Sequence, residues 1–262
     1  MVGGEQGPGF PVRLATRAVV LFLMILGLLA GGCTELSGAA PPALGARMPV
    51  RERLVFDEEF NGTRLNAKRW SPYDSPGNGG HGLRRPSAFS LDGHGHLVVT
   101  ADMRDGRIVS GGMASRFNFE YGRVEVRVRT DSDPTGTTSG VVLTWPESGD
   151  WPVDGENDIY ETGDAPGTRS PFYSFVHFGA TNQQYQFVHD ADGTRWQTIV
   201  MDWSAKAIRF YLNGAPAGTV TNPRAIPHVP HHVCVQLDAE SDGSLVRPVR
   251  MYVDYIRVYQ LH

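Results

Sequence analysis

Residues 123–129 read RVEVRVR, a run in which valine alternates with a charged residue without a slip. Successive side chains of a β-strand point to opposite faces, so this run predicts a strand with one buried face and one wet face. Residues 208–212, IRFYL, form a second candidate strand and are followed at once by Asn213-Gly214, a strong hairpin signal. The two segments together favour antiparallel β-structure.

Further β-branched or aromatic runs follow, separated by clusters of Gly, Pro, Asn and Asp. They lie at residues 97–101, 140–145, 172–178, 197–203, 217–220 and 251–259. No long segment has a helical period, so the chain is predicted to be all-β, a two-sheet sandwich or a barrel. Residues 251–256 carry large apolar side chains on both faces, which suits a central strand covered by a partner sheet on one side and by a cleft or loops on the other.

The N-terminal segment predicts export. Arg13 and Arg17 precede an apolar run over residues 18–30, which is too short to span a membrane and has the flanks of a signal peptide. Small residues lead into Cys33, so we expect a lipoprotein-like signal over residues 1–32 and a lipid anchor on Cys33 that holds the protein on the outer side of the membrane. The alternative is ordinary cleavage and secretion.

Residues 33–49 are rich in Ala, Pro, Gly and Ser and predict a flexible tether, which leaves residues 50–262 as one folded domain. The net charge of −4 and the lack of a long basic run favour no nucleic-acid partner. Cys33 and Cys234 are the two cysteines, so no disulfide framework is expected, and Cys234 is predicted to be a buried core residue. We expect a monomer.

Residues 155–161 read GENDIYE, with three carboxylates at the spacing E-x-D-x-x-E. On a regular strand Glu156 and Asp158 share a face, whereas Glu161 points the opposite way. One extra residue in a β-bulge between Asp158 and Glu161 would place all three on one face. Crowded acids repel one another, so chemistry is the favoured reason for them; the alternative is a solvated acidic edge strand that deters aggregation.

Two carboxyl groups flanking a sugar linkage would suit glycoside hydrolysis. A retaining mechanism requires them roughly 5 to 5.5 Å apart, one as nucleophile and one protonated. Long glutamate side chains at positions 156 and 161 could converge across a bulged strand, and Asp158 between them would bias which one holds the proton. Trp145, Trp151 and Tyr160 are candidate substrate-binding rings, because sugars stack their C–H faces on aromatic side chains.

Several motifs occur in an order that resembles glycoside hydrolase family 16. Residues 56–62 (FDEEFNG) look like its entry motif and residues 121–127 (YGRVEVR) like its Y-G-R-x-E-x-R strand. Residues 253–259 (VDYIRVY) look like its closing strand, and Trp151-Pro152 leads into the acidic strand as in that family. The resemblance extends over residues 54–260, and the bulged spacing is similar to the laminarinase-like and agarase-like branches.

The resemblance implies roles for individual residues. Glu156 would be the nucleophile, Glu161 the general acid and base, and Asp158 their electrostatic partner, with His177 as a histidine of the cleft. The implied fold is a concanavalin A-like β-jelly roll with an open cleft on its concave face. The implied activity is retaining endo-hydrolysis of a β-linked polysaccharide, with a β-1,3-glucan favoured and no cofactor required.

The resemblance also suggests a structural calcium ion, held by Glu59 and Asp254. The histidines at 228, 231 and 232 are interpreted instead as a solvated loop, since they lack a zinc-binding pattern.

Two other functions stay open. A transglycosylase acting on a cell-wall glycan would share the covalent intermediate, and a carbohydrate-binding jelly roll without turnover would use the same cleft. Asn157 departs from the apolar residue usual in the family and is expected to face the core, where its amide needs hydrogen-bond partners. The substrate is expected to depend on the loops at residues 75–87 and 132–139.

Overall fold

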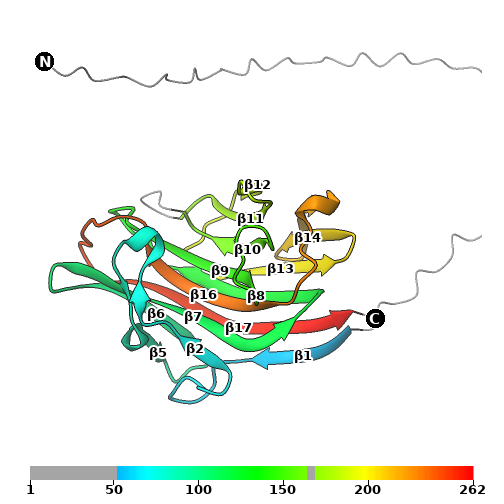
Figure 1. The fold of residues 1–262 in the computed structure, drawn as a ribbon. Coiled ribbons are helices and arrows are strands. Elements are labelled where there is room, and N and C mark those ends of the chain that lie inside the picture. Colours follow the sequence, from blue (N-terminus) through cyan, green and yellow to red (C-terminus); the bar gives the residue numbers. More distant parts are fainter. Residues whose placement is uncertain (1–51, 164–168, 262) are drawn as a thin grey trace, which may run out of the picture. The chain divides into compact units, whose positions relative to one another are not determined.

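The computed structural model describes residues 52–163 and 169–261, and the predicted signal peptide, lipidated Cys33 and tether lie outside them. The described part contains seventeen β-strands and three one-turn 3-10 helices, which confirms the all-β prediction. Among these residues no helix is both long and apolar enough to span a membrane. The strands form two mainly antiparallel layers, each called a sheet below, that pack face to face and are joined by the pairing of β6 (Leu97–Arg104) with β7 (Arg107–Phe119) (Figure 1).

The first sheet, here the back sheet, is built around the long strand β17 (Val249–Leu261). On one side β17 pairs with β8 (Gly122–Thr130), and on the other it pairs first with β6 and then with β1. The remaining pairings extend the sheet outward. Its other strands are β1 (Glu52–Glu58), β5 (Phe89–Leu91), β6 (Leu97–Arg104), β13 (Gln197–Ser204), β14 (Ala207–Leu212) and β15 (Ala215–Val220).

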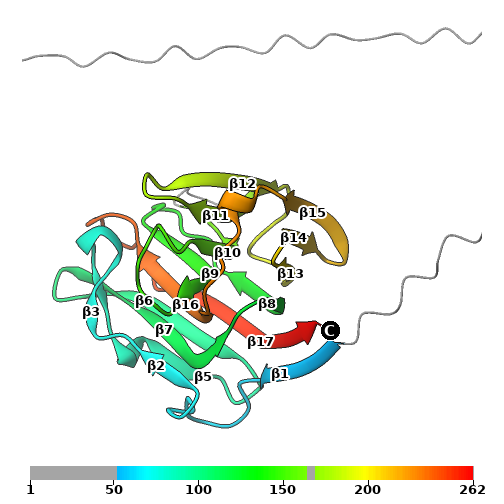
Figure 2. The ribbon, with the colours of Figure 1, turned by 45° about the vertical axis from the view of Figure 1, so that its right-hand side comes forward.

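The second sheet, here the cleft sheet, has the order β2, β7, β16, β9, β10, β11, β12 (Figure 2). Its strands are β2 (Trp70–Pro72), β7 (Arg107–Phe119), β9 (Thr138–Pro146), β10 (Glu156–Glu161), β11 (Phe172–Phe178), β12 (Gln183–His189) and β16 (His231–Ala239). A small hairpin of β3 (Ser75–Pro76) and β4 (Leu83–Arg84) lies against β7. The 3-10 helices are η1 (Asn78–Gly80), η2 (Pro86–Ala88) and η3 (Pro223–Ala225).

The core between the sheets follows from alternation along the strands. Val124, Val126 and Val128 of β8 are fully buried, while the charged residues between them are partly exposed, as residues 123–129 predict. Trp70 and Trp203 are also fully buried in this core. Each fully buried apolar side chain of this kind stabilises the fold by about 1.5–3 kcal/mol relative to an exposed one.

Several strands were not predicted from the sequence, and for two of them, β12 and β7, the physical reason is clear. β12 lies at the edge of the cleft sheet and pairs with β11, and most of its side chains are exposed, so it lacks an apolar pattern. β7 contains Gly111 and Gly112, where neighbouring aromatic rings leave no room for a Cβ atom. The Asn213-Gly214 hairpin is confirmed, because both residues have positive φ between β14 and β15.

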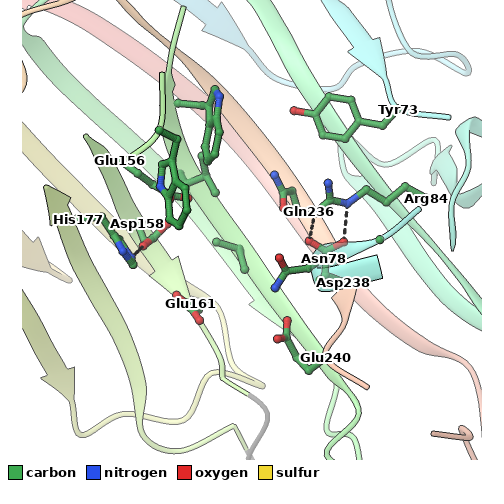
Figure 3. Close-up of a pocket in the computed structure, with 16 residues that line it drawn as sticks. Tyr73, Asn78, Arg84, Glu156, Asp158, Glu161, His177, Gln236, Asp238 and Glu240 are labelled. Carbon is green, nitrogen blue, oxygen red and sulfur yellow. Dashed lines mark hydrogen bonds and ion pairs between the residues drawn. The ribbon is translucent and has the colours of Figure 1, made fainter. Parts of the chain in front are cut away.

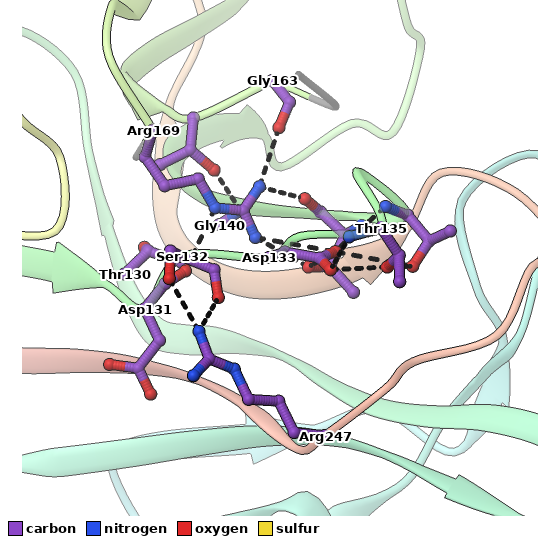
Figure 4. Close-up of polar contacts among 12 residues, drawn as sticks. Thr130, Asp131, Ser132, Asp133, Thr135, Gly140, Gly163, Arg169 and Arg247 are labelled. Atoms are coloured by element: carbon purple, nitrogen blue, oxygen red, sulfur yellow. Dashed lines mark hydrogen bonds and ion pairs between the residues drawn. The ribbon is translucent and has the colours of Figure 1, made fainter. Parts of the chain in front are cut away.

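A buried arginine connects two loops next to β9 and β10 (Figure 4). The Arg169 guanidinium is about 1% exposed and donates to the carbonyls of Asp131, Thr138 and Gly163. Asp133, also buried, accepts from the backbone N–H groups of Thr135, Thr137 and Thr138. The loop at residues 132–139 is thereby tied to the segment that follows β10.

Replacing Arg169 with leucine should lower the free energy of unfolding by about 3–5 kcal/mol. Three carbonyls would lose their donor, and the buried carboxylate of Asp133 would lose the guanidinium that lies 3.9 Å from it. Urea unfolding followed by tryptophan fluorescence measures the change. Arg195, whose side chain is 82% exposed, provides the matched control, and Arg195→Leu should change the stability by less than about 0.5 kcal/mol. Equal effects of the two substitutions would contradict the structural role of Arg169.

Candidate active site

The acidic strand β10 contains the predicted bulge. Asp158 pairs with Phe175 of β11 and Glu161 pairs with Tyr173, so three steps on β10 match two on its neighbour. Ile159 and Tyr160 are both fully buried toward the core, which returns Glu161 to the face that carries Glu156 and Asp158. The bulge is confirmed, and it is what brings all three carboxylates to one surface.

These carboxylates line a cleft of about 530 Å³ on the outer face of the cleft sheet (Figure 3). Strands β9, β10, β11 and β16 provide its floor, and residues 73–84 form part of its wall. The expectation that the segment at residues 75–87 shapes the cleft is therefore confirmed for Gly77, Asn78, Gly79 and Arg84. The other loop, residues 132–139, does not line this cleft.

Glu156 lies deep in the cleft, with 9% of its surface exposed. Its Oε2 accepts a hydrogen bond of 2.6 Å from Nε1 of Trp151. Burial, followed by the negative charge of Asp158, raises the pKa of Glu156 to about 8. The Trp151 N–H acts in the opposite direction, since it favours the carboxylate form.

Asp158 contacts His177, with 2.9 Å between Oδ2 and Nε2. The other ring nitrogen of His177 lies 2.8 Å from Oδ1 of Asn182, an acceptor, so Nδ1 carries a hydrogen. Nε2 of His177 and Oδ2 of Asp158 are therefore joined by a hydrogen that either the imidazole or the carboxyl group donates. Burial raises the pKa of Asp158 to about 7. Ligand atoms of Glu156, Asp158 and His177 all lie within 4.8 Å of one another.

Glu161 lies on the other side of Asp158 and points into the same cleft (Figure 3). Burial, then the negative charges of Asp158 and Glu240, raise its pKa to about 8. Within the described residues Glu161 receives no N–H comparable to the one that Trp151 gives Glu156. Burial thus raises the pKa of both glutamates alike, and they differ in hydrogen bonding, which favours the carboxylate form at Glu156.

The predicted aromatic platforms divide into two groups. Trp145 and Trp151 line the cleft and stack with their centroids 6.0 Å apart at an interplanar angle of 12°. Trp151 is 39% exposed and so offers a ring face to a ligand. Tyr160 was predicted wrongly as a substrate-binding ring. It is one of the two bulge residues, lies fully buried, and donates its hydroxyl hydrogen toward Thr130 or the carbonyl of Gly193.

Sequence reasoning missed a row of polar residues opposite the catalytic strand. Gln236 and Asp238 of β16, with Glu240 just beyond it, line the cleft at alternate positions. Arg84 joins this row by pairing with both oxygens of Asp238 and with the amide oxygen of Gln236. Alternation with the buried residues Val235, Leu237 and Ala239 would have revealed the row, since it marks residues 236, 238 and 240 as facing outward.

Three further residues discussed from the sequence, Cys234, Asn157 and His231, are all buried. Cys234 is buried as expected, but it lies in a small apolar cluster with Val141 and Leu143 under the cleft. Asn157 faces the core, where its Nδ2 donates to Thr144. His231 is fully buried between Thr144 and the carbonyl of Asp154, so the interpretation as a solvated loop is wrong for this histidine.

The side chains at the proposed calcium position do not fit that ion as they stand. Glu59 accepts from the guanidinium of Arg257, and Asp254 accepts from that of Arg127. Neither acid belongs to a group of three or more potential metal ligands in the described part of the chain. An arginine cation therefore engages one carboxylate oxygen of each acid that calcium would need.

Solved structures with the same fold come from several organisms. LamAcat from Zobellia galactanivorans is 21% identical, with a TM-score of 0.66, and the alignment covers 79% of this chain and 97% of LamAcat. The laminarinase from Flavobacterium sp. UMI-01 is 21% identical, with a TM-score of 0.69 and coverages of 79% and 100%. The catalytic domain of an endo-1,3-beta-glucanase (laminarinase) from Thermotoga petrophila RKU-1 is 18% identical, with a TM-score of 0.69 and coverages of 81% and 99%.

At these identities the likeness shows the fold, a β-jelly roll sandwich. A search of curated protein sequences gave no match. The model of the glycosyl hydrolases family 16 matches residues 84–257, which contain the bulged strand, His177 and most of the cleft. The chain therefore belongs to glycosyl hydrolase family 16 and is a glycoside hydrolase.

Proposed function

We propose that the protein is a retaining endo-glycosidase in which Glu156 is the nucleophile and Glu161 the general acid and base. The bulge carries this proposal, because it places two glutamates on one face of β10 with Asp158 between them. The cleft is open and lies across several strands, which suits a chain that is cut internally.

In the first step Glu161 donates its proton to the glycosidic oxygen while an oxygen of Glu156 attacks the anomeric carbon. The bond between that carbon and the leaving oxygen breaks, and the leaving sugar departs as an alcohol. Both glutamates have a pKa raised to about 8, so the cleft holds protons near neutral pH, and the roles follow from which glutamate has a fixed hydrogen-bond donor. Trp151 favours the carboxylate form of Glu156, and the proton between Asp158 and His177 limits the negative charge beside it.

In the second step the Glu161 carboxylate removes a proton from water, whose oxygen attacks the anomeric carbon. The ester bond to Glu156 breaks and its electrons return to the carboxylate. Glu161 ends the cycle protonated again. Two displacements at one carbon retain the configuration, so the product has the same anomeric form as the substrate.

A neutral β-1,3-glucan is the proposed substrate. Two of the similar structures carry the name laminarinase, and a stacked tryptophan pair lines the cleft. The carboxylates of Glu156, Asp158, Glu161, Asp238 and Glu240 all line it, with Arg84 bound to Asp238. Among the described residues that line the cleft the one arginine, Arg84, is already bound to Asp238, which leaves no free arginine for a sulfate or carboxylate group of a glycan.

Reducing-end release from laminarin, lichenan, agarose, xyloglucan and a cell-wall glycan extract tests the substrate. The wild type should act best on laminarin, and Glu156→Ala should lower kcat by at least about four orders of magnitude, because the covalent step loses its nucleophile. Transfer products without reducing-end release would instead indicate a transglycosylase. Binding to laminarin that is equal in both proteins, with no turnover in either, would contradict the proposal.

The pH profile should have a basic limb near pH 8. Above the pKa of Glu161, about 8, the acid is ionised and cannot protonate the leaving oxygen, so kcat/KM should fall about tenfold per pH unit. The glycosylation of Glu156 by a 2,4-dinitrophenyl glycoside needs no proton, and its rate should lack this limb. A basic limb near pH 5 on polysaccharide would contradict the assignment of Glu161.

We also propose that the enzyme is exported and anchored by a lipid on Cys33, which Arg13, Arg17 and the apolar residues 18–30 support. In a bacterial host the wild type should then fractionate with membranes, and Cys33→Ala should move the activity to the soluble exported fraction. Mass spectrometry of the mature N-terminus checks the modification. An unmodified N-terminus at another residue would contradict the anchor and favour secretion.

A further inference from the structure

The extra residue of the catalytic bulge is held by a buried side chain of the neighbouring strand. Ile159 has no pairing partner in β9 or in β11. Its carbonyl oxygen accepts a hydrogen bond of 2.8 Å from Oγ of Ser174, which is fully buried in β11. A bulge disrupts the ladder locally, so this hydroxyl replaces a ladder contact at the point where the strand bends.

The same hydroxyl contacts a buried histidine. Nε2 of His189, at the end of β12, lies 2.8 Å from Oγ of Ser174. A carbonyl can only accept, so the single hydrogen of Ser174 is used on Ile159, and the hydrogen in the second contact must come from His189. Burial lowers the pKa of His189 to about 4, so the ring is neutral near pH 7 with its hydrogen on Nε2. The order of donation is thus His189 to Ser174 to Ile159.

The second bulge residue is anchored independently. The hydroxyl of Tyr160 lies 3.1 Å from both Oγ1 of Thr130 and the carbonyl oxygen of Gly193. Glu161 follows directly, whereas Glu156 lies before the bulge on the regular part of the ladder. The separation of the two glutamates therefore depends on the conformation of Ile159 and Tyr160.

We propose that Ser174 and His189 are positioning residues for the reaction, which act by holding the Ile159 carbonyl and so set the reach of Glu161 toward Glu156. Neither side chain lines the cleft, and both are buried behind its floor. The inference rests on the proposed roles of the two glutamates. A misplacement of about 1 Å in such an arrangement can cost about 10²-fold in rate.

Ser174→Ala removes the donor to Ile159 without adding volume. On the polysaccharide that the wild type cleaves, kcat should fall about 10- to 100-fold, with KM changed less than about twofold, because Glu161 acts only in the chemical steps. Ser174→Thr keeps the hydroxyl and should recover most of the rate. The matched control is Ser110→Ala, since the hydroxyl of Ser110 is also buried but has no hydrogen-bond partner within the described residues.

A substrate with an activated leaving group distinguishes a mispositioned Glu161 from a general disturbance of the active site. The 2,4-dinitrophenyl β-glycoside of the substrate's disaccharide unit releases its phenolate without an acid, so Glu156 is still glycosylated. Azide then attacks the anomeric carbon without a base, and Glu156 leaves as the carboxylate. Azide should therefore accelerate turnover by Ser174→Ala, as by the reference variant Glu161→Ala, and leave Ser110→Ala unaffected. The new product is the β-glycosyl azide.

The outcomes distinguish a failure of this inference from a failure of the proposed function. An inactive wild type would overturn the proposed function, whereas an active wild type with unchanged kcat in Ser174→Ala would overturn the positioning role alone. Equal kcat losses in Ser174→Ala and Ser110→Ala, without azide acceleration, would also overturn it. If Ser174→Ala does not fold, His189→Leu decides with the same two substrates: a lower kcat with azide acceleration supports the role, and wild-type kcat overturns it.

Discussion

The active site depends on a geometric constraint of the β-strand. Side chains alternate with a period of two, so residues five positions apart cannot share a face of a regular ladder. The bulge at Ile159 and Tyr160 removes this conflict and places Glu161 beside Glu156 and Asp158. The bulge interrupts the ladder, and on the core side the hydroxyl of Ser174 donates to the carbonyl of Ile159, while the hydroxyl of Tyr160 anchors its own side chain to Thr130 or Gly193.

Crowding and burial then give the acids their different chemistry. Ionising all three carboxylates of one strand in a partly desolvated cleft is energetically unfavourable, and burial raises the pKa of each. Trp151 stabilises the charge on Glu156, and His177 shares a proton with Asp158. Within the described residues Glu156 has the fixed Trp151 donor and Glu161 has no comparable one, and this difference provides the asymmetry that glycoside hydrolysis needs.

The sequence predicted the elements whose patterns are local. The alternation at residues 123–129 and the Asn213-Gly214 turn identified strand and hairpin, and the odd spacing of residues 156–161 required a bulge. The prediction was wrong for Tyr160. A bulge turns two successive side chains to the same side, here the core, and the closeness of Tyr160 to the acids in the sequence does not reveal which side its ring faces. Edge strand β12 was missed because its exposed side chains carry no apolar signal.

By itself the sequence determined the all-β class, the family motifs and the three acids, since each of these depends on residues that lie close together in the sequence. Only the tertiary structure decided what faces those acids across the cleft. Arg84 comes from β4, and Asp238 and Glu240 come from the end of β16 and the position just after it, all far from β10 in the chain. The buried contact between Ser174 and His189 joins two strands behind the bulge. Such contacts depend on strand register and sheet packing, which bring distant residues together without a local pattern to mark them.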